Sequence, residues 1–188
     1  TSQVPAKKTR FITYCQRIAA ILLLPAIIAI VALMMKKDHQ EPLIAYNEVT
    51  APYGMVSSLT LPDSSKVWLN AGSTLKYPAA FTSNVREVEM SGEAYFEVHA
   101  DKEHPFIVNT GDLKVTATGN AFNICSFAKA QEEVITLVTG KVAVSQENNI
   151  KHLLPGQQLN YQRASKSMEI TDIDTYKYIS WKDGILAF

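Results

Sequence analysis

The chain has 188 residues, and its 18 Lys and Arg balance its 18 Asp and Glu, so the formal net charge is zero. The charges are unevenly distributed, because residues 1–37 contain six Lys or Arg and no Asp or Glu, whereas residues 38–188 contain 12 basic and 18 acidic residues. Nucleic acid binding needs clustered Lys and Arg that neutralise phosphates, so the acidic longer part argues against direct nucleic acid binding.

An uninterrupted run of 18 apolar residues extends from Ile18 to Met35. An α-helix rises about 1.5 Å per residue, so this run reaches about 27 Å, close to the roughly 30 Å hydrocarbon core of a bilayer. A buried core helix and a secretory signal are the alternatives. The run is longer than the apolar stretch of most signals and ends without a small-residue cleavage site. Residues 18–35 are therefore predicted to form a single transmembrane helix, kinked at Pro25.

The charges that flank this helix predict its orientation. Four Lys or Arg precede the run and two follow it directly, and the side richer in these residues faces the cytoplasm. We therefore expect residues 1–17 to form a cytoplasmic juxtamembrane stub and residues 36–49 to form a linker on the opposite side. Because only 17 residues, starting with Thr1, precede the helix, we expect the chain to be a piece of a longer protein.

Beyond the linker, apolar and polar residues alternate with a period of two, which is typical of β-strands. In Glu93–Val98 every second residue is apolar, and we expect Glu93 and Glu97 to lie on an exposed face. Further strands are predicted at Met55–Leu61, Lys66–Leu69, Arg86–Met90, Phe106–Val108, Leu113–Ala117, Ala121–Phe127, Glu133–Val138, Lys141–Ser145, Gln157–Tyr161 and Met168–Thr171.

Turn residues separate these strands at short intervals. Leu61–Ser65 predicts a Pro/Asp turn, Thr139-Gly140 a tight hairpin, Glu147–Asn149 a polar turn and Leu154–Gln157 a Pro/Gly turn. Residues 50–172 are thus predicted to form an all-β domain that is long enough to bury its own core. A sandwich, a jelly-roll-like barrel and a short β-solenoid all fit this pattern. In residues 173–188 a helical connector is followed by a predicted strand at Ile185–Phe188.

Residues suited to enzyme chemistry are scarce. None of the four histidines has a second ligand at metal-binding spacing, and no serine-nucleophile or phosphate-binding glycine motif occurs in the sequence. Glu93 and Glu97 resemble a glycosidase pair, but two solvated positions on a strand face are the simpler interpretation. Cys125 lies in an apolar stretch and is predicted to be a core residue. We expect no enzyme activity, no catalytic residues, no cofactor and no metal.

Four motifs follow one another in the predicted β domain, at Leu61–Pro78, Ser91–Val98, Pro105–Val108 and Leu154–Gln157. In this order they resemble the FecR-type anti-sigma regulators of the Bacteroidota, and the resemblance covers about residues 50–165. Residues 181–188 resemble the start of the C-terminal αβ domain that follows in these proteins. The resemblance therefore implies a FecR-like periplasmic β domain over residues 50–172.

The resemblance also implies a signalling role at the inner membrane. Such proteins hold an extracytoplasmic-function (ECF) sigma factor through a cytoplasmic domain that is not in this chain, and they cross the lipid bilayer once. In the periplasm they receive a signal from the signalling domain of a TonB-dependent outer-membrane transporter. We further expect membrane proteases as partners and edge strands of the β domain as docking sites.

Some relatives cleave themselves at a Gly-Thr bond, where the threonine hydroxyl attacks the preceding carbonyl. The matching position here is Gly119-Asn120, and an amide side chain cannot perform that attack. The resemblance therefore implies that this chain does not cleave itself by that route.

An alternative function is a membrane-tethered periplasmic β-sandwich that binds carbohydrate. Such modules present exposed aromatic side chains in one strip, for which Trp68, Tyr77, Tyr95 and Tyr161 are the candidates, although the neighbours of Trp68 favour a core position. An enzyme with scattered catalytic residues is a third, weaker alternative.

Overall fold

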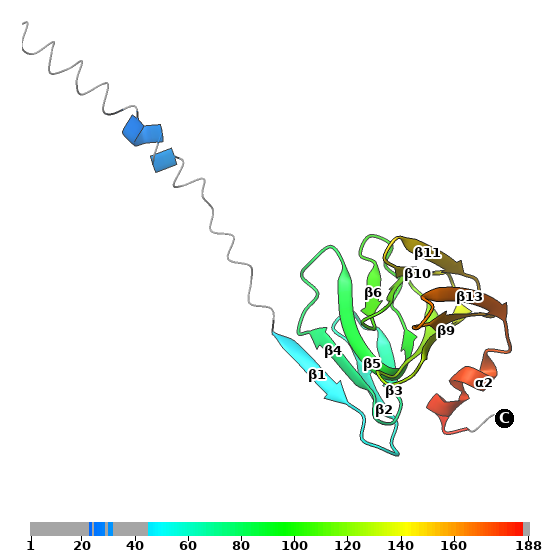
Figure 1. The fold of residues 1–188 in the computed structure, drawn as a ribbon. Helices are drawn as coiled ribbons and strands as arrows, with labels where there is room; N and C mark the ends of the chain where they lie inside the picture. Colours follow the sequence, from blue (N-terminus) through cyan, green and yellow to red (C-terminus); the bar gives the residue numbers. More distant parts are fainter. Residues whose placement is uncertain (1–22, 24, 29, 32–44, 186–188) are drawn as a thin grey trace, which may run out of the picture. The chain divides into compact units, whose positions relative to one another are not determined.

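β-Strands make up most of the regular structure in the computed structural model, which describes residues 23, 25–28, 30, 31 and 45–185 (Figure 1). The chain divides into two units, Thr1–Leu43 and Ile44–Phe188. The described positions of the apolar run are helical. Among the described residues, no helix has the length and apolar character needed to cross a membrane. The span predicted over residues 18–35 falls largely outside the described residues.

The second unit contains thirteen strands and two short helical turns within residues 45–185. The strands are β1 (Tyr46–Thr50), β2 (Ser57–Thr60), β3 (Lys66–Leu69), β4 (Thr74–Pro78), β5 (Arg86–Glu97), β6 (Phe106–Asn109), β7 (Lys114–Ala117), β8 (Ala121–Ser126), β9 (Glu132–Thr139), β10 (Val142–Gln146), β11 (Asn149–Leu153), β12 (Gln157–Gln162) and β13 (Ser167–Asp172). They are followed by the helix α2 (Tyr176–Ile179) and the 3₁₀ turn η1 (Ser180–Asp183).

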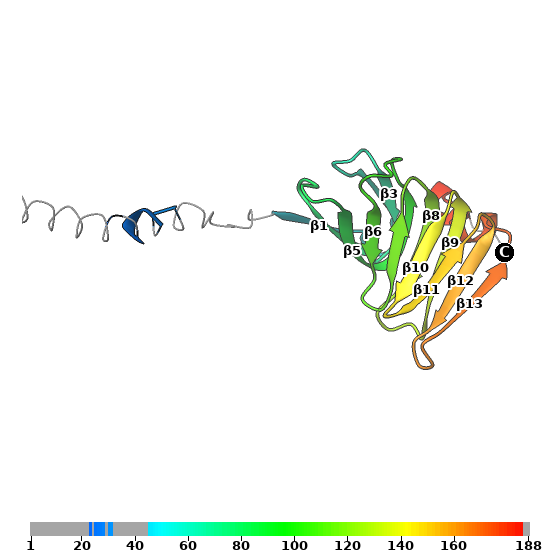
Figure 2. The same cartoon turned by 90° about the horizontal axis from the view of Figure 1, so that it is seen from above.

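These strands form two sheets that share β5 (Figure 2). Sheet A has the order β1-β4-β5-β6-β7-β10-β11, and sheet B has the order β2-β3-β5-β8-β9-β12-β13. After β5 the chain adds one hairpin to each sheet in turn, with β6–β7 and β10–β11 in sheet A and β8–β9 and β12–β13 in sheet B. The fold is thus mainly β, as predicted. Successive hairpins along the chain belong alternately to sheet A and sheet B.

β5 passes from sheet A to sheet B at Gly92. Its first half pairs with β4 and β6, and its second half pairs with β3 and β8. Gly92 has a φ of +105°, and a Cβ at this position would lie 2.7 Å from Ser73 Cα. Glycine alone combines this backbone angle with such a close approach. The two strands predicted at Arg86–Met90 and Glu93–Val98 are therefore halves of one strand.

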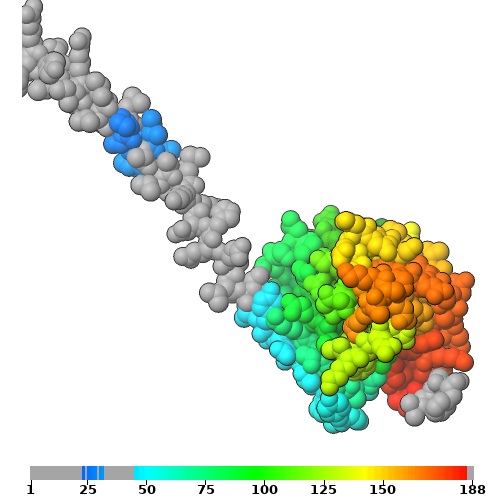
Figure 3. All heavy atoms as spheres, in the orientation of Figure 1, coloured from blue at the N-terminus to red at the C-terminus, as the bar shows by residue number. Residues whose placement is uncertain are grey.

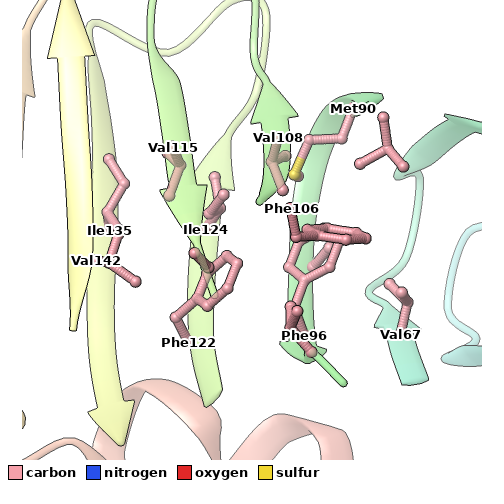
Figure 4. Packing of buried hydrophobic residues seen from close by; sticks show 14 of the residues in the cluster. Val67, Met90, Phe96, Phe106, Val108, Val115, Phe122, Ile124, Ile135 and Val142 are labelled. Carbon is pink, nitrogen blue, oxygen red and sulfur yellow. The ribbon is translucent and has the colours of Figure 1, made fainter. Parts of the chain in front are cut away.

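A single hydrophobic core lies between the two sheets (Figure 4). Phe106 of sheet A lies 6.1 Å from Phe96 of sheet B, measured between ring centroids, and Phe96 stacks on Phe122 at 5.2 Å. All three rings are fully buried, and burying such a side chain contributes roughly 1.5–3 kcal/mol. This cluster joins the two layers.

The strand predictions between Met55 and Thr171 agree with the structure, to within a few residues at the ends. The strand predicted at Ile185–Phe188 lies outside the described residues except for Ile185, which is not in a strand. Three strands were not predicted, namely β1, β4 and β11. β1 includes positions 46–49, which the sequence analysis assigned to the linker. The edge strand β11 is exposed at four of its five positions, so its residues do not alternate in polarity.

The hairpin predicted at Thr139-Gly140 is wrong. β9 pairs with β8 and β12 in sheet B, whereas β10 pairs with β7 and β11 in sheet A. Gly140 has a φ of +82°, which suits a tight turn, but this turn carries the chain from one sheet to the other. The turns predicted at Leu61–Ser65, Glu147–Asn149 and Leu154–Gln157 are present.

Candidate functional site

The Gly119-Asn120 bond lies in the turn where the chain passes from β7 in sheet A to β8 in sheet B. Gly119 has a φ of +139°, and a Cβ at this position would lie 2.7 Å from Ala100 Cα. This position therefore requires glycine. The turn is tied to the end of β5, because the Val98 N–H donates to the Asn120 carbonyl at 2.9 Å.

The Asn120 side chain holds this turn from within and is only 6% exposed. Its Oδ1 accepts hydrogen bonds from the Thr118 N–H at 2.8 Å and from the Gly119 N–H at 3.0 Å. Its Nδ2 donates to the Thr139 carbonyl at 3.4 Å, and a Cβ at Gly140 would overlap this amide group. The geometry gives Asn120 a structural role as the acceptor that closes the turn. The predicted lack of self-cleavage stays a prediction.

A hollow of about 330 Å³ opens beside this bond. Lys66, Glu97 and His99 line it, and all three side chains are exposed. Binding pockets for small molecules are mostly apolar and enclose their ligands. This hollow is instead an open polar surface next to the turn.

Glu93 and Glu97 lie in different environments, although both point to the outer face of sheet B. Glu97 is exposed, as predicted, whereas Glu93 is half-buried, so the prediction that both are exposed is wrong for Glu93. The Glu93 carboxylate accepts hydrogen bonds from Asn70 Nδ2 at 2.8 Å and from Asn123 Nδ2 at 2.9 Å. These two donors stabilise the charged carboxylate. The sequence alone did not reveal them as partners of Glu93, because both are distant from it along the chain.

A row of side chains crosses the outer face of sheet B from β3 to β12. Paired positions in neighbouring strands place its members side by side, and they are Trp68, Tyr95, Asn123, Thr136 and Gln158. We call this set the outer row. Burial, together with the nearby charges of Glu97 and Asp183, raises the pKa of Tyr95 to about 12. Tyr161 is buried in the core. Neither Tyr95 nor Tyr161 is exposed in this structure, so neither adds to an exposed aromatic strip for carbohydrate here.

A buried ion pair lies at the start of β5. Arg86 Nη1 donates to Asp63 Oδ2 at 2.6 Å, and the two side chains are 5% and 9% exposed. Arg86 also donates to the carbonyl oxygens of His99 at 3.0 Å and His104 at 2.8 Å. A hollow of about 480 Å³ lies beside this pair. Because its guanidinium already donates to a carboxylate and to carbonyl groups, Arg86 has a structural role. It joins the start of β5 to the turn that contains Asp63 and to the loop that contains His99 and His104.

A second charged network joins the two sheets around Glu133, whose side chain is fully buried. Its carboxylate accepts hydrogen bonds from Thr110 Oγ1 at 2.6 Å and from Arg163 Nη2 at 3.1 Å. Arg163 Nε also donates to Asp112 Oδ2 at 2.8 Å. Burial raises the pKa of Glu133. The network ties the β6–β7 turn of sheet A to β9 and the end of β12 in sheet B.

Among the described residues, no three His, Cys, Asp or Glu side chains come together in a way that could hold a metal ion. His104 Nδ1 lies 2.8 Å from Asp101 Oδ2, and this hydrogen bond lowers the pKa of Asp101. Cys125 is half-buried on the outer face of sheet B, outside the core in which it was predicted. Burial and the charge of Glu93 raise its pKa to about 12, so its thiol stays protonated at neutral pH.

Comparisons with known proteins connect this fold to a family. The family model described as "FecR protein" matches residues 47–143. Two crystal structures of a protein described as an anti-sigma factor from Parabacteroides distasonis ATCC 8503 are similar to this chain, with TM-scores of 0.73 and 0.72 at 34% and 35% identity. The similarity covers 74% and 73% of this chain but 66% and 65% of those chains. No curated protein matches the chain.

Proposed function

The chain belongs to the FecR protein family, and we propose that it is the transmembrane and signal-relaying part of an anti-sigma factor. One observation carries this proposal. The family match over residues 47–143 falls within the β-rich unit Ile44–Phe188, and the 18-residue apolar run precedes that unit in the sequence. An anti-sigma role also agrees with the description of the two similar crystal structures.

We propose that residues 18–35 anchor the protein in the inner membrane, with residues 1–17 in the cytoplasm and the β-rich unit in the periplasm. The excess of Lys and Arg before the run supports this orientation. A cytoplasmic domain outside this chain would hold an ECF sigma factor. The signal would come from the signalling domain of a TonB-dependent outer-membrane transporter.

The relay works through protein contact, without enzyme activity of its own. Four edge strands offer unpaired backbone groups within residues 45–185, namely β1 and β11 of sheet A and β2 and β13 of sheet B. A partner segment can add to such an edge as a further strand. Membrane proteases would then cut the anchor, and Pro25 would loosen its helix for the cut within the bilayer.

A transcription assay tests this function. The full-length protein is expressed with its candidate ECF sigma factor and a reporter gene that this sigma factor controls. We expect the protein to co-purify with the sigma factor and to make the reporter dependent on the transporter's ligand. Deletion of residues 44–188 should abolish the ligand response while sigma factor binding persists. Failure of the full-length protein to bind any ECF sigma factor of its own genome would contradict the proposal.

A further inference from the structure

The outer row lies on a sheet face that would normally contact solvent, yet most of it is buried. Tyr95, Asn123, Thr136 and Gln158 are between 0% and 4% exposed. All four side chains end in an amide or a hydroxyl, and Gln158 Nε2 donates to Thr136 Oγ1 at 2.9 Å. Polar side chains buried on the outer face indicate that another part of the protein covers them.

The C-terminal segment Thr175–Gly184, which contains α2 and η1, covers the aromatic end of the outer row at Trp68 and Tyr95. Lys182 Nζ lies 5.7 Å from the ring centroid of Trp68 and 5.3 Å from that of Tyr95, so one ammonium group faces two rings of the outer row. Ser180 in the same segment is 2% exposed. Figures 1 and 2 place this red segment beside sheet B, and in Figure 3 it continues the surface formed by β13.

The segment has few features that would hold it in place by itself. Its two helical turns have four residues each, and helices this short are not stable alone. One side-chain hydrogen bond supports the start of α2, because Asp174 Oδ1 accepts from the Tyr176 N–H at 3.1 Å. Tyr176 and Tyr178 are 50% and 39% exposed, so these two side chains contribute only part of their surface to the contact. The segment is therefore held by a small contact made by Ile179, Ser180, Trp181 and Lys182. Lys182 Nζ, which faces the two rings, is also paired with Asp183 Oδ1 at 2.9 Å.

Two polar atoms in this region have no hydrogen-bond partner among the described residues. One is the acceptor Asn123 Oδ1 on the outer row, and the other is the donor Trp181 Nε1 on the segment. Buried polar groups without partners favour states in which water reaches them. The contact thus includes a penalty that is relieved when the segment leaves the sheet.

We propose that residues 175–184 form a strap that docks on the outer row reversibly while the rest of the β-rich unit stays folded. In the docked state Lys182 lies over Trp68 and Tyr95. In the open state Asn123 and Trp181 are hydrated and the aromatic part of the outer row faces solvent. The strap goes beyond the proposed function, since its opening needs neither a sigma factor nor a transporter and is tested without them.

The chain contains only two tryptophans, Trp68 in the outer row and Trp181 in the strap. The full chain, kept in detergent because of its apolar run, is titrated with urea while tryptophan emission and the β-sheet circular dichroism signal are recorded. We expect emission to shift to longer wavelength at a lower urea concentration than that at which the β signal is lost. Lys182→Gln should lower the midpoint of the first transition and leave the second unchanged.

Trypsin cleavage after Lys177 in native buffer provides a second readout, because cleavage tracks the population of the open state. Loss of a cation–π contact should accelerate this cut roughly tenfold in Lys182→Gln. Lys151→Gln, which changes an exposed lysine on the edge strand β11, is the matched control and should leave all three measurements unchanged. Coincident emission and β-signal transitions in the wild type, or a Lys182→Gln protein that does not fold, would show that the segment is a fixed part of the domain and overturn the proposal.

Discussion

Gly92 shows how a single residue determines the relation between the two sheets. Its positive φ lets β5 turn from sheet A into sheet B, and its missing side chain leaves room for the Ser73 backbone. The glycine was recognisable in the sequence as part of the Ser91–Val98 motif. Its close contact with Ser73 was not, because that contact depends on the pairing of β4 with β5.

Gly92→Ala should lower the free energy of unfolding by about 2–4 kcal/mol, since a methyl group adds both backbone strain and a clash. Urea denaturation measures this change. Gly54→Ala is a matched control, because Gly54 has a φ of +78° but nothing within 4 Å of the added Cβ. The control should cost only about 1 kcal/mol. Equal losses in both variants would contradict the role given to the Ser73 contact.

Asn120 illustrates what a family resemblance can and cannot predict. The resemblance identified the position and the missing hydroxyl, whereas the structure adds that the amide accepts two backbone N–H groups in the turn. Those bonds link neighbouring residues in a turn that joins β7 of sheet A to β8 of sheet B. Sequence alone gives no access to the shape of this turn.

We predict that purified wild-type protein remains a single chain at Gly119-Asn120. Asn120→Ala should also remain intact, but it should be less stable by about 1–3 kcal/mol because two N–H groups lose their acceptor. Gel electrophoresis with N-terminal sequencing and urea denaturation provide the two measurements. A fragment that begins at Asn120 in the wild type would refute the first part.

At the scale of elements, alternation of period two located most strands but could not assign them to sheets. A strand such as Glu132–Thr139 carries the same pattern in either sheet, and its partners are chosen by packing with distant segments. The wrong hairpin at Thr139-Gly140 has this origin, since a glycine with positive φ serves a hairpin and a change of sheet equally well. The network around Glu133 was missed for the same reason, since Thr110 and Arg163 are distant from it along the chain.

This network predicts a pH dependence of stability. Burial raises the pKa of Glu133 in the folded state above its ordinary value of 4.5. At a pH between 4.5 and the raised pKa, the folded state therefore holds a proton that the unfolded state has released. The contribution of Glu133 to stability is therefore present at low pH and is lost as the pH rises through the raised value.

Glu133→Gln keeps the shape of the side chain and removes its titration. We expect the unfolding free energy of the wild type, relative to that of Glu133→Gln, to fall as the pH rises from 4.5. Urea denaturation of both proteins at several pH values gives this difference. A difference that rises with pH would mean that the ion pair with Arg163 outweighs the cost of burial.

At the scale of the whole molecule, the chain contains two kinds of segment. A basic stub and an apolar run precede an acidic unit of two sheets around one core. Composition predicted this division, because charge and hydropathy change abruptly near residue 37. How the two sheets share β5 had to come from the structure.

The central claim is that the apolar run separates a cytoplasmic end from a periplasmic β-rich unit. Fusing a reporter to each end of the chain in bacterial cells tests it most directly. Alkaline phosphatase fused after Phe188 should be active, and green fluorescent protein fused before Thr1 should fluoresce, because the first reporter works only in the periplasm and the second only in the cytoplasm. Green fluorescent protein is also fused after Phe188. If the phosphatase is inactive there and green fluorescent protein fluoresces at both ends, both flanks lie on the cytoplasmic side of the membrane, which would contradict the central claim.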